Sequence, residues 1–201
     1  MFSSIYLGSN NYIDVRFRTY LRDTHLLNMT LIVIGVTLLS LMAQVSIPLP
    51  FSPVPITGQS FAVLIIGSLY GAKRAAITTV SYLAIGLLGM PVFSGASFGI
   101  AKILGPTGGY LIGFVVAASI MGLLAEMKAD RNLKSAFITF AIGHSLIFIF
   151  GLIWLGFYVG FSNVLQLGLF PFLPGMVIKT IAASGVNILF WRSKCKREYI
   201  H

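Results

Sequence analysis

Charged residues are scarce in this sequence: they make up 9% of its 201 residues, and only five are acidic. A typical soluble domain has roughly 25% charged residues. Hydrophobic residues account for 57% of the chain, a share that excludes an ordinary water-soluble surface. A bilayer needs about 20 mostly apolar residues per spanning helix. We therefore expect an all-α membrane protein, a compact bundle of about six transmembrane helices joined by short loops.

Other absences exclude whole classes of function. The single cysteine, Cys195, rules out an internal disulfide and a cysteine metal cluster. There is no Gly-Lys pair, and hence no phosphate-binding loop of the Walker type, so any ATP hydrolysis must come from partners. The apolar stretches contain no carboxylate, which argues against an enzyme and against a proton-driven carrier. We expect no metal and no cofactor.

Six apolar stretches are broken from one another by proline, glycine or charge. Lys179 is the only charged residue inside any of them. We predict a cytoplasmic N-terminal segment (1–25), a six-helix transmembrane domain (26–193) and a basic cytoplasmic tail (194–201). The predicted spans cover residues 26–47, 56–72, 75–93, 105–125, 135–161 and 170–191.

The basic residues predict the orientation in the membrane. They gather in alternate connections, whereas the connections 48–55, 94–104 and 162–169 hold one basic residue between them, Lys102. The positive-inside rule then places both termini in the cytoplasm of a multi-pass plasma-membrane protein. The basic clusters are Arg16, Arg18 and Arg22; Lys73 and Arg74; Lys128, Arg131 and Lys134; and Arg192, Lys194, Lys196 and Arg197.

Lys179 is the strongest candidate for function. An unpaired ammonium in hydrocarbon costs several kcal/mol, and no span offers it a carboxylate. The missing counter-charge is then expected to be a ligand. The alternative is structural: the long side chain snorkels outward or donates to backbone carbonyls.

Two predicted helix N-termini lie at the outer face of the membrane, near this lysine. The fourth span opens on Gly105-Pro106-Thr107-Gly108-Gly109, just after Lys102, and the sixth opens with Pro171 and Pro174. Both spans begin outside, so their positive dipole ends face outward. If they converge with Lys102 and Lys179, they form an outward-facing pocket that favours a carboxylate or a strongly dipolar carbonyl.

Four other polar side chains lie within apolar spans. His144 is about 14 Å into the fifth span at 1.5 Å per residue, near mid-membrane. Gln59, Tyr82 and Tyr110 lie on the second, third and fourth spans. Each can orient a ligand in an apolar pocket, and each can equally bond a neighbouring helix.

The connection between the first two spans is rich in proline. It reads Ser46-Ile47-Pro48-Leu49-Pro50-Phe51-Ser52-Pro53-Val54-Pro55. Proline fixes φ and stiffens the chain, so we expect an extended outer loop. Such a loop over a pocket mouth would act as a lid, formed by Pro48, Pro50, Phe51, Pro53 and Pro55.

Together these motifs closely resemble the BioY family of biotin transport proteins. The resemblance rests on residues 46–55, Pro91-Val92-Phe93, residues 105–111, and Pro171 to Gly175 followed by Lys179, and it covers roughly residues 43–180. It implies the substrate-binding component of an energy-coupling-factor (ECF) transporter, which captures biotin outside. Its implied partners are a membrane coupling protein and two cytoplasmic ATPases, although some BioY proteins act alone.

The resemblance also assigns roles to residues. It implies that Lys179 contacts biotin and that Gln59, Tyr82 and Tyr110 line the pocket. Met176 stands where the family usually has an aspartate that accepts from the ureido N–H groups. His144 stands where asparagine is common, and we hypothesise that its unprotonated ring nitrogen partly replaces the lost acceptor.

The departures leave alternatives open. The lost aspartate allows the same fold to prefer another small vitamin or carboxylate. The first span has only Gly35 and Ala43 on the stripe where such components carry Ala-x-x-x-Ala to dock their coupling partner. A carrier that works without ATPase partners is therefore a second alternative.

Overall fold

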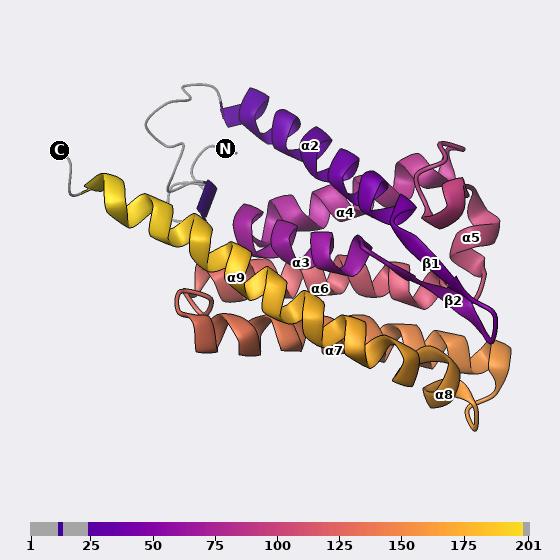
Figure 1. Cartoon of the computed structure of the whole chain (residues 1–201). Coiled ribbons are helices and arrows are strands. Elements are labelled where there is room, and N and C mark those ends of the chain that lie inside the picture. The colour runs from indigo at the N-terminus through magenta and orange to yellow at the C-terminus, as the bar shows by residue number, and fades with distance from the viewer. Residues whose placement is uncertain (1–11, 14–23, 199–201) are drawn as a thin grey trace.

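The computed structural model describes residues 12–13 and 24–198, which form an almost entirely helical bundle (Figure 1). Successive long helices run in opposite directions, so α2 begins and α9 ends at the same end of the bundle. The prediction of a mostly helical protein is confirmed. The described helices of twelve or more residues are α2 (Thr24–Gln44), α3 (Gln59–Tyr70), α4 (Ala72–Leu87), α6 (Gly108–Glu126), α7 (Leu133–Val159) and α9 (Leu173–Glu198).

Four helical stretches in the described part of the chain are long and apolar enough to cross a membrane. Helix α3 is shorter: its 12 residues span about 18 Å at 1.5 Å per residue, against a hydrocarbon core of about 30 Å. The chain is thus a helical membrane protein in which one central helix is short. The four stretches are His25–Gln44, Gly108–Glu126, Leu133–Val159 and Val164–Arg192.

The junction between α3 and α4 differs from the prediction. We expected a loop at Lys73 and Arg74, but both lie in the first turn of α4, and the chain turns at Gly71. Gly71 has a φ of 81°, a conformation that favours glycine because it lacks a Cβ. The Arg74 Nε donates to Asn28 Oδ1 of α2 at 2.5 Å. With this hydrogen-bond partner on a neighbouring helix, the basic residue lies within a helix and not in a loop.

The predicted third span also ended too late, because short helices occupy the connection that follows it. The third span was expected to reach residue 93, but α4 ends at Leu87. The predicted tail 194–201 is partly helical, since α9 continues to Glu198, whereas most of the predicted segment 1–25 lies outside the described residues. The short helices are η2 (Ser94–Ala96), α5 (Ile100–Leu104), α8 (Val164–Gly168) and η3 (Phe170–Phe172).

The proline-rich segment is extended, and it folds back on itself as a two-stranded antiparallel hairpin of β1 (Ser46–Leu49) and β2 (Ser52–Thr57). The pairing sets Ser46 opposite Thr57, with an irregularity between Ile47 and Leu49. Proline cannot donate to a ladder, and in a two-stranded sheet both strands are edges, where it is tolerated. The hairpin leads directly into α3.

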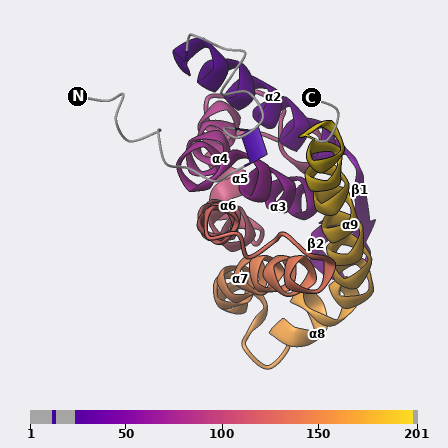
Figure 2. The same cartoon turned by 90° about the vertical axis from the view of Figure 1, so that its left-hand side faces the viewer.

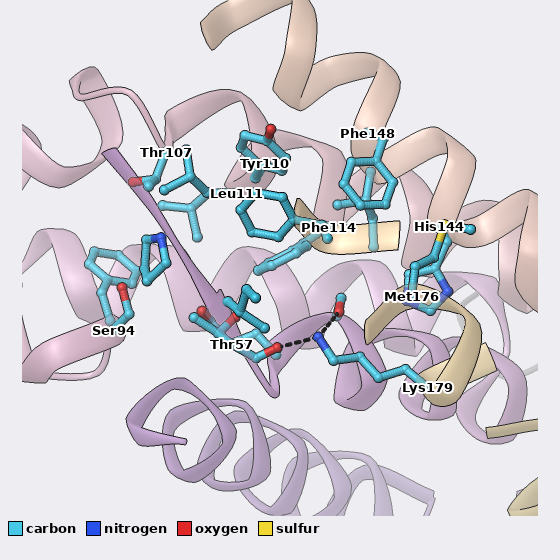
Figure 3. A pocket seen from close by; sticks show the side chains of 18 of the residues that line it. Thr57, Ser94, Thr107, Tyr110, Leu111, Phe114, His144, Phe148, Met176 and Lys179 are labelled. Atoms are coloured by element: carbon cyan, nitrogen blue, oxygen red, sulfur yellow. Dashed lines mark hydrogen bonds between the residues drawn. The ribbon is translucent and has the colours of Figure 1, made fainter. Parts of the chain in front are cut away.

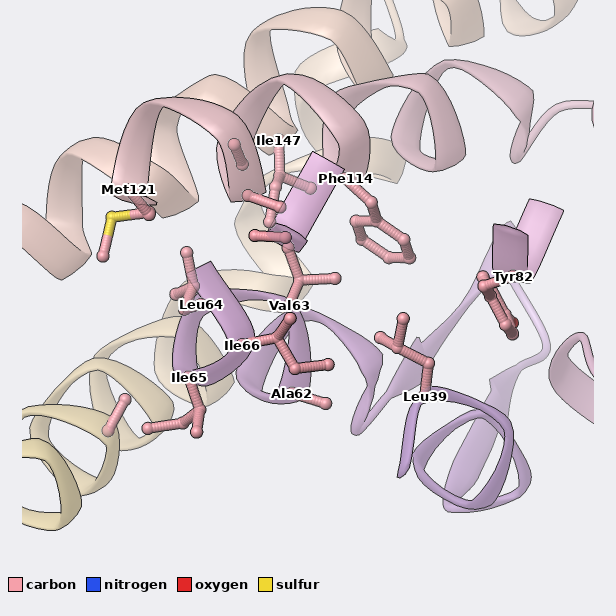
Figure 4. Close-up of a cluster of buried hydrophobic side chains, with 14 of the residues drawn as sticks. Leu39, Ala62, Val63, Leu64, Ile65, Ile66, Tyr82, Phe114, Met121 and Ile147 are labelled. Carbon is pink, nitrogen blue, oxygen red and sulfur yellow. The ribbon is translucent and has the colours of Figure 1, made fainter. Parts of the chain in front are cut away.

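Helix α3 forms the middle of the bundle, with the other helices around it (Figure 2). Ala62, Val63 and Leu64 have no exposed surface. They belong to one buried cluster with Leu39 of α2 and Met121 of α6 (Figure 4). A helix that is apolar on all sides is stable only when it is enclosed. Helix α3 is therefore the enclosed, central helix of the bundle.

A buried polar cluster joins three elements at the opposite end of the bundle from the hairpin. Asp130, in the turn between α6 and α7, has no exposed surface and accepts a hydrogen bond from Ser68 of α3. Asn187 of α9 donates to the Asp130 backbone oxygen at 2.8 Å. The Arg131 Nε lies 3.6 Å from Asp130 Oδ1. We call Ser68, Asp130 and Asn187 the polar clasp.

Gly122 of α6 packs closely against the start of α4. A Cβ built on Gly122 would lie 2.2 Å from the Ala72 backbone nitrogen, whereas one on Gly185 of α9 would meet nothing within 4 Å. Gly122→Ala is expected to lower the free energy of unfolding by about 1–3 kcal/mol through overpacking. Gly185→Ala, the matched control, should not destabilise. Thermal unfolding in detergent measures both, and equal melting of the two variants would contradict the packing argument.

Candidate ligand-binding site

A pocket lies at the end of the bundle where α3, α6 and α9 begin (Figure 3). Its lining comes from β2, the first turn of α3, residues 93–94, Lys102 of α5, and α6, α7 and α9. Lys102 and Lys179 both belong to it, as do Thr107 at the start of α6 and Met176 at the start of α9. The structure thus places together the two helix starts and the two lysines that the sequence suggested.

The Lys179 side chain reaches the base of the hairpin. Its Nζ donates to the Thr57 carbonyl at 2.6 Å and to Ser60 Oγ at 3.3 Å. No carboxylate among the described side chains lies within 4 Å of it. The ammonium therefore donates to a backbone carbonyl, as the structural alternative expected, and also lines the pocket. An ammonium has three hydrogens, and these two bonds leave one for a ligand.

His144 lies beside Lys179 and Met176 in the pocket (Figure 3). The side chain is 2% exposed, and its Nδ1 is 2.9 Å from Thr180 Oγ1 of α9. Its Nε2 is buried without a hydrogen-bond partner. A buried polar atom without a partner is costly, and such an atom in a pocket lining is available to a ligand.

Gln59 and Tyr82 take different positions from those expected. Gln59 lines the pocket, and its Nε2 donates to the Tyr82 hydroxyl at 2.7 Å. Tyr82 is absent from the lining: it is 1% exposed, donates to the Val92 carbonyl at 2.9 Å and packs edge-on against Phe93. Its hydroxyl is already engaged on both sides. Tyr82 thus orients Gln59, whose carbonyl oxygen remains for the pocket.

Aromatic rings form the apolar wall of the pocket. Tyr110, Phe148 and Phe172 pack on one another with ring centroids 6.2 to 6.5 Å apart. The Tyr110 hydroxyl donates to the Gly168 carbonyl at 2.9 Å, so its ring faces the pocket while its polar atom ties α6 to α8. Such a wall suits the apolar body of a small molecule.

The hairpin covers the pocket with its second strand. Of the five residues predicted as a lid, Pro55 lines the pocket, whereas Pro48, Pro50, Phe51 and Pro53 do not. The lining residues of β2 run consecutively from Val54 to Thr57, so it is the end of the strand next to α3 that reaches the pocket. The Ser52 hydroxyl donates to the Leu167 carbonyl at 2.7 Å and fastens the turn of the hairpin to α8.

Lys102 is the second cation of the pocket. It lies in the last turn of α5, and burial lowers its pKa below that of a free lysine. As with Lys179, no described carboxylate lies within 4 Å of its amine. The pocket therefore combines two amines without a described carboxylate partner, an imidazole and an aromatic wall. That combination suits an apolar molecule that carries an anionic group and further hydrogen-bonding atoms.

Comparison with known proteins identifies the family. The model of the BioY family matches residues 15–195. The chain is 39% identical over 154 residues to the probable biotin transporter BioY of Pyrococcus horikoshii, covering 77% of this chain and 90% of that protein. It is 33% identical over 163 residues to biotin transporter BioY2 of Lactococcus lactis, covering 80% and 88%.

The fold also has a close structural counterpart. The S-component for biotin from an ECF-type ABC transporter, a crystal structure at 2.1 Å, superimposes with a TM-score of 0.78 and 27% sequence identity. The match covers 86% of this chain and 94% of that one. All of these relatives are transporters or transporter components by name, which agrees with the prediction that the chain is not an enzyme. The family model spans most of the sequence, and the chain belongs to the BioY family.

Proposed function

We propose that this chain binds biotin in the pocket beneath the hairpin and mediates its uptake as the substrate-binding component of an ECF-type transporter. The observation that carries the proposal is the Lys179 ammonium, which lines a pocket with an aromatic wall and has no carboxylate partner among the described residues. The names of the relatives and of the structural counterpart support biotin as the ligand.

Biotin has chemical parts that match the pocket. Its bicycle is apolar and suits the wall of Tyr110, Phe148 and Phe172. Its carboxylate and its ureido carbonyl are acceptors, which the free hydrogens of Lys179 and Lys102 complement. Its ureido N–H groups are donors, which the Gln59 carbonyl oxygen and His144 Nε2 complement. We propose that these residues contact the ligand and that Pro55, with the rest of β2, closes over it.

The proposal extends to the membrane and to partners. We propose that all six helices of twelve or more residues, the short α3 included, lie across the plasma membrane, with both termini in the cytoplasm and the pocket facing outward. The basic residues at the α2–α9 end of the bundle support this orientation. We further propose that an ECF membrane coupling protein and two cytoplasmic ATPases supply the energy, and that the pocket works without a metal or cofactor.

Binding of labelled biotin to the purified, detergent-solubilised protein tests the proposed ligand. Saturable binding that unlabelled biotin displaces, and that excess thiamine and riboflavin leave unchanged, is the expected result. Displacement by thiamine or riboflavin would instead support the alternative in which the same fold serves another vitamin. Uptake in cells that lack the ATPase partners separates an ECF component from a stand-alone carrier.

A further inference from the structure

Helix α5, which carries Lys102 of the pocket, is too small to hold its own position. It has five residues, none of them buried, and it lies at the hairpin end of the bundle (Figure 1). Ile100 and Leu104 are both more than half exposed. A helix this short is unstable by itself. The position of the Lys102 side chain therefore depends on what other elements do to α5.

Two side chains of α7 bond the end of α5. Trp154 Nε1 donates to the Gly105 carbonyl at 2.9 Å, and the Tyr158 hydroxyl donates to the Leu104 carbonyl. The two donors are four residues apart, so they lie on one face of α7. The last carbonyls of a helix lack partners within it, and in apolar surroundings such groups must be bonded elsewhere. Trp154 and Tyr158 supply those bonds.

Trp154 also packs against the beginning of α6. A Cβ built on Gly109 would lie 2.2 Å from the Trp154 Cβ, so a larger residue at this position would displace the indole. The ordinary role of tryptophan near a membrane surface is that of an interfacial anchor, whose N–H group faces the headgroups. Here the indole N–H is used inside the protein, at the carbonyl three residues after Lys102.

We propose that Trp154 and Tyr158 are positioning residues that hold the Lys102 ammonium in the pocket, and that they affect ligand affinity through Lys102. Lys102 lines the pocket, whereas Trp154 and Tyr158 do not. The other end of α5 is fixed as well, because the Gly99 N–H donates to the Gly86 carbonyl of α4 at 2.8 Å. The inference rests on the proposed function for its ligand, an anionic molecule such as biotin.

A double-mutant cycle in biotin binding tests the link to Lys102. Lys102→Met is expected to weaken binding by roughly 10- to 150-fold, as for a hydrogen bond to a charged group, and Trp154→Phe by roughly two- to tenfold. The double variant should bind no more weakly than Lys102→Met alone, because the indole then has no ammonium to position. Effects that multiply, or a Lys102→Met protein that binds like wild type, would overturn the proposal.

Lys179 provides the contrast in the same assay. Its ammonium is bonded to Thr57 and Ser60, so Trp154→Phe should weaken binding by the same factor with Lys179→Met as it does in the wild-type background. A general loosening of the pocket would multiply with both lysine variants alike. Tyr158→Phe keeps the ring and removes only the hydroxyl, so it repeats the test with less risk to folding.

Hydrogen exchange in the empty protein tests the anchoring without a ligand. Trp154→Phe and Tyr158→Phe should each speed exchange of the backbone amides of residues 99–105 by roughly two- to tenfold and leave exchange in α9 unchanged. Trp191→Phe is the matched control, the same substitution beside Arg131 at the opposite end of the bundle, and should leave residues 99–105 as in the wild type.

The exchange result separates this proposal from the proposed function. Unchanged exchange at residues 99–105 in both α7 variants would overturn the positioning role even if the protein binds biotin. The proposed function fails separately, if the wild-type protein does not bind biotin at all.

Discussion

Replacing Lys179 by methionine is expected to weaken biotin binding by roughly 10- to 150-fold, the equivalent of a hydrogen bond to a charged group worth about 1.5–3 kcal/mol. Methionine keeps the length of an apolar stem but removes all three N–H donors. The remaining hydrogen of the ammonium is the one expected to reach the ligand, because Thr57 and Ser60 occupy the other two. Equilibrium binding of labelled biotin measures the effect.

Two further measurements distinguish a ligand contact from a structural role. The empty Lys179→Met protein should melt close to the wild-type temperature, because the loss of two bonds is offset by removing a buried charge without a described carboxylate partner. Lys134→Ala, an exposed lysine near the start of α7, is the control and should leave both binding and melting unchanged. If Lys179→Met instead binds biotin at full strength, the electrostatic basis of the proposed function is wrong.

The general architecture could be predicted because the backbone polar groups of a chain in hydrocarbon must bond to one another. Long apolar runs without charge can only be helices in a bilayer, and the runs that became α2, α6 and α7 were placed to within a few residues. The α3–α4 junction was misplaced because charge was taken as the sign of a loop. Arg74 belongs to a helix since Asn28, far away in sequence, meets its guanidinium. Long-range partners of this kind leave no local pattern.

The site was predictable where one residue was out of place for its surroundings. Lys179 and His144 stand out in apolar spans, and the structure places both in the pocket. Tyr82 looked equally suitable, but its hydroxyl is used by Gln59 and the Val92 carbonyl. The reverse holds for Ser60 and Thr180, which the sequence analysis missed. Small hydroxyl residues are common within helices, so their contacts with Lys179 and His144 appear only in three dimensions.

Asp130 is a carboxylate that lies outside the predicted spans. It is in the turn between α6 and α7, a place where an acidic residue is expected to be exposed to solvent. It is nevertheless fully buried and held by Ser68 and Asn187. Asn187 follows Lys179 by eight residues on α9, about 12 Å along the helix axis. The polar clasp therefore holds its carboxylate away from Lys179 and ties α9 to α3 and to the turn between α6 and α7.

Asp130→Ala is accordingly expected to lower the free energy of unfolding by about 2–5 kcal/mol. It removes the hydrogen bonds that Ser68 and Asn187 donate to a buried carboxylate, and hydrogen bonds to charged groups contribute about 1.5–3 kcal/mol each. The Ser68 hydroxyl keeps Asn187 Oδ1, at 2.8 Å, as an acceptor. Asp130→Asn keeps one carbonyl oxygen for Ser68 and should cost clearly less. Unfolding in detergent, induced by heat or by denaturant, measures the stability of both variants.

The control for this experiment is Ser119→Ala, which removes a hydroxyl that donates to the Val115 carbonyl of its own helix and should have little effect. At temperatures where Asp130→Ala is still folded, its affinity for biotin should stay within a few-fold of wild type, because the polar clasp lies at the end of the bundle opposite the pocket. An Asp130→Ala protein that melts like wild type would show that the clasp adds nothing to stability. A variant that melts normally but loses biotin would instead couple the clasp to the pocket through α9.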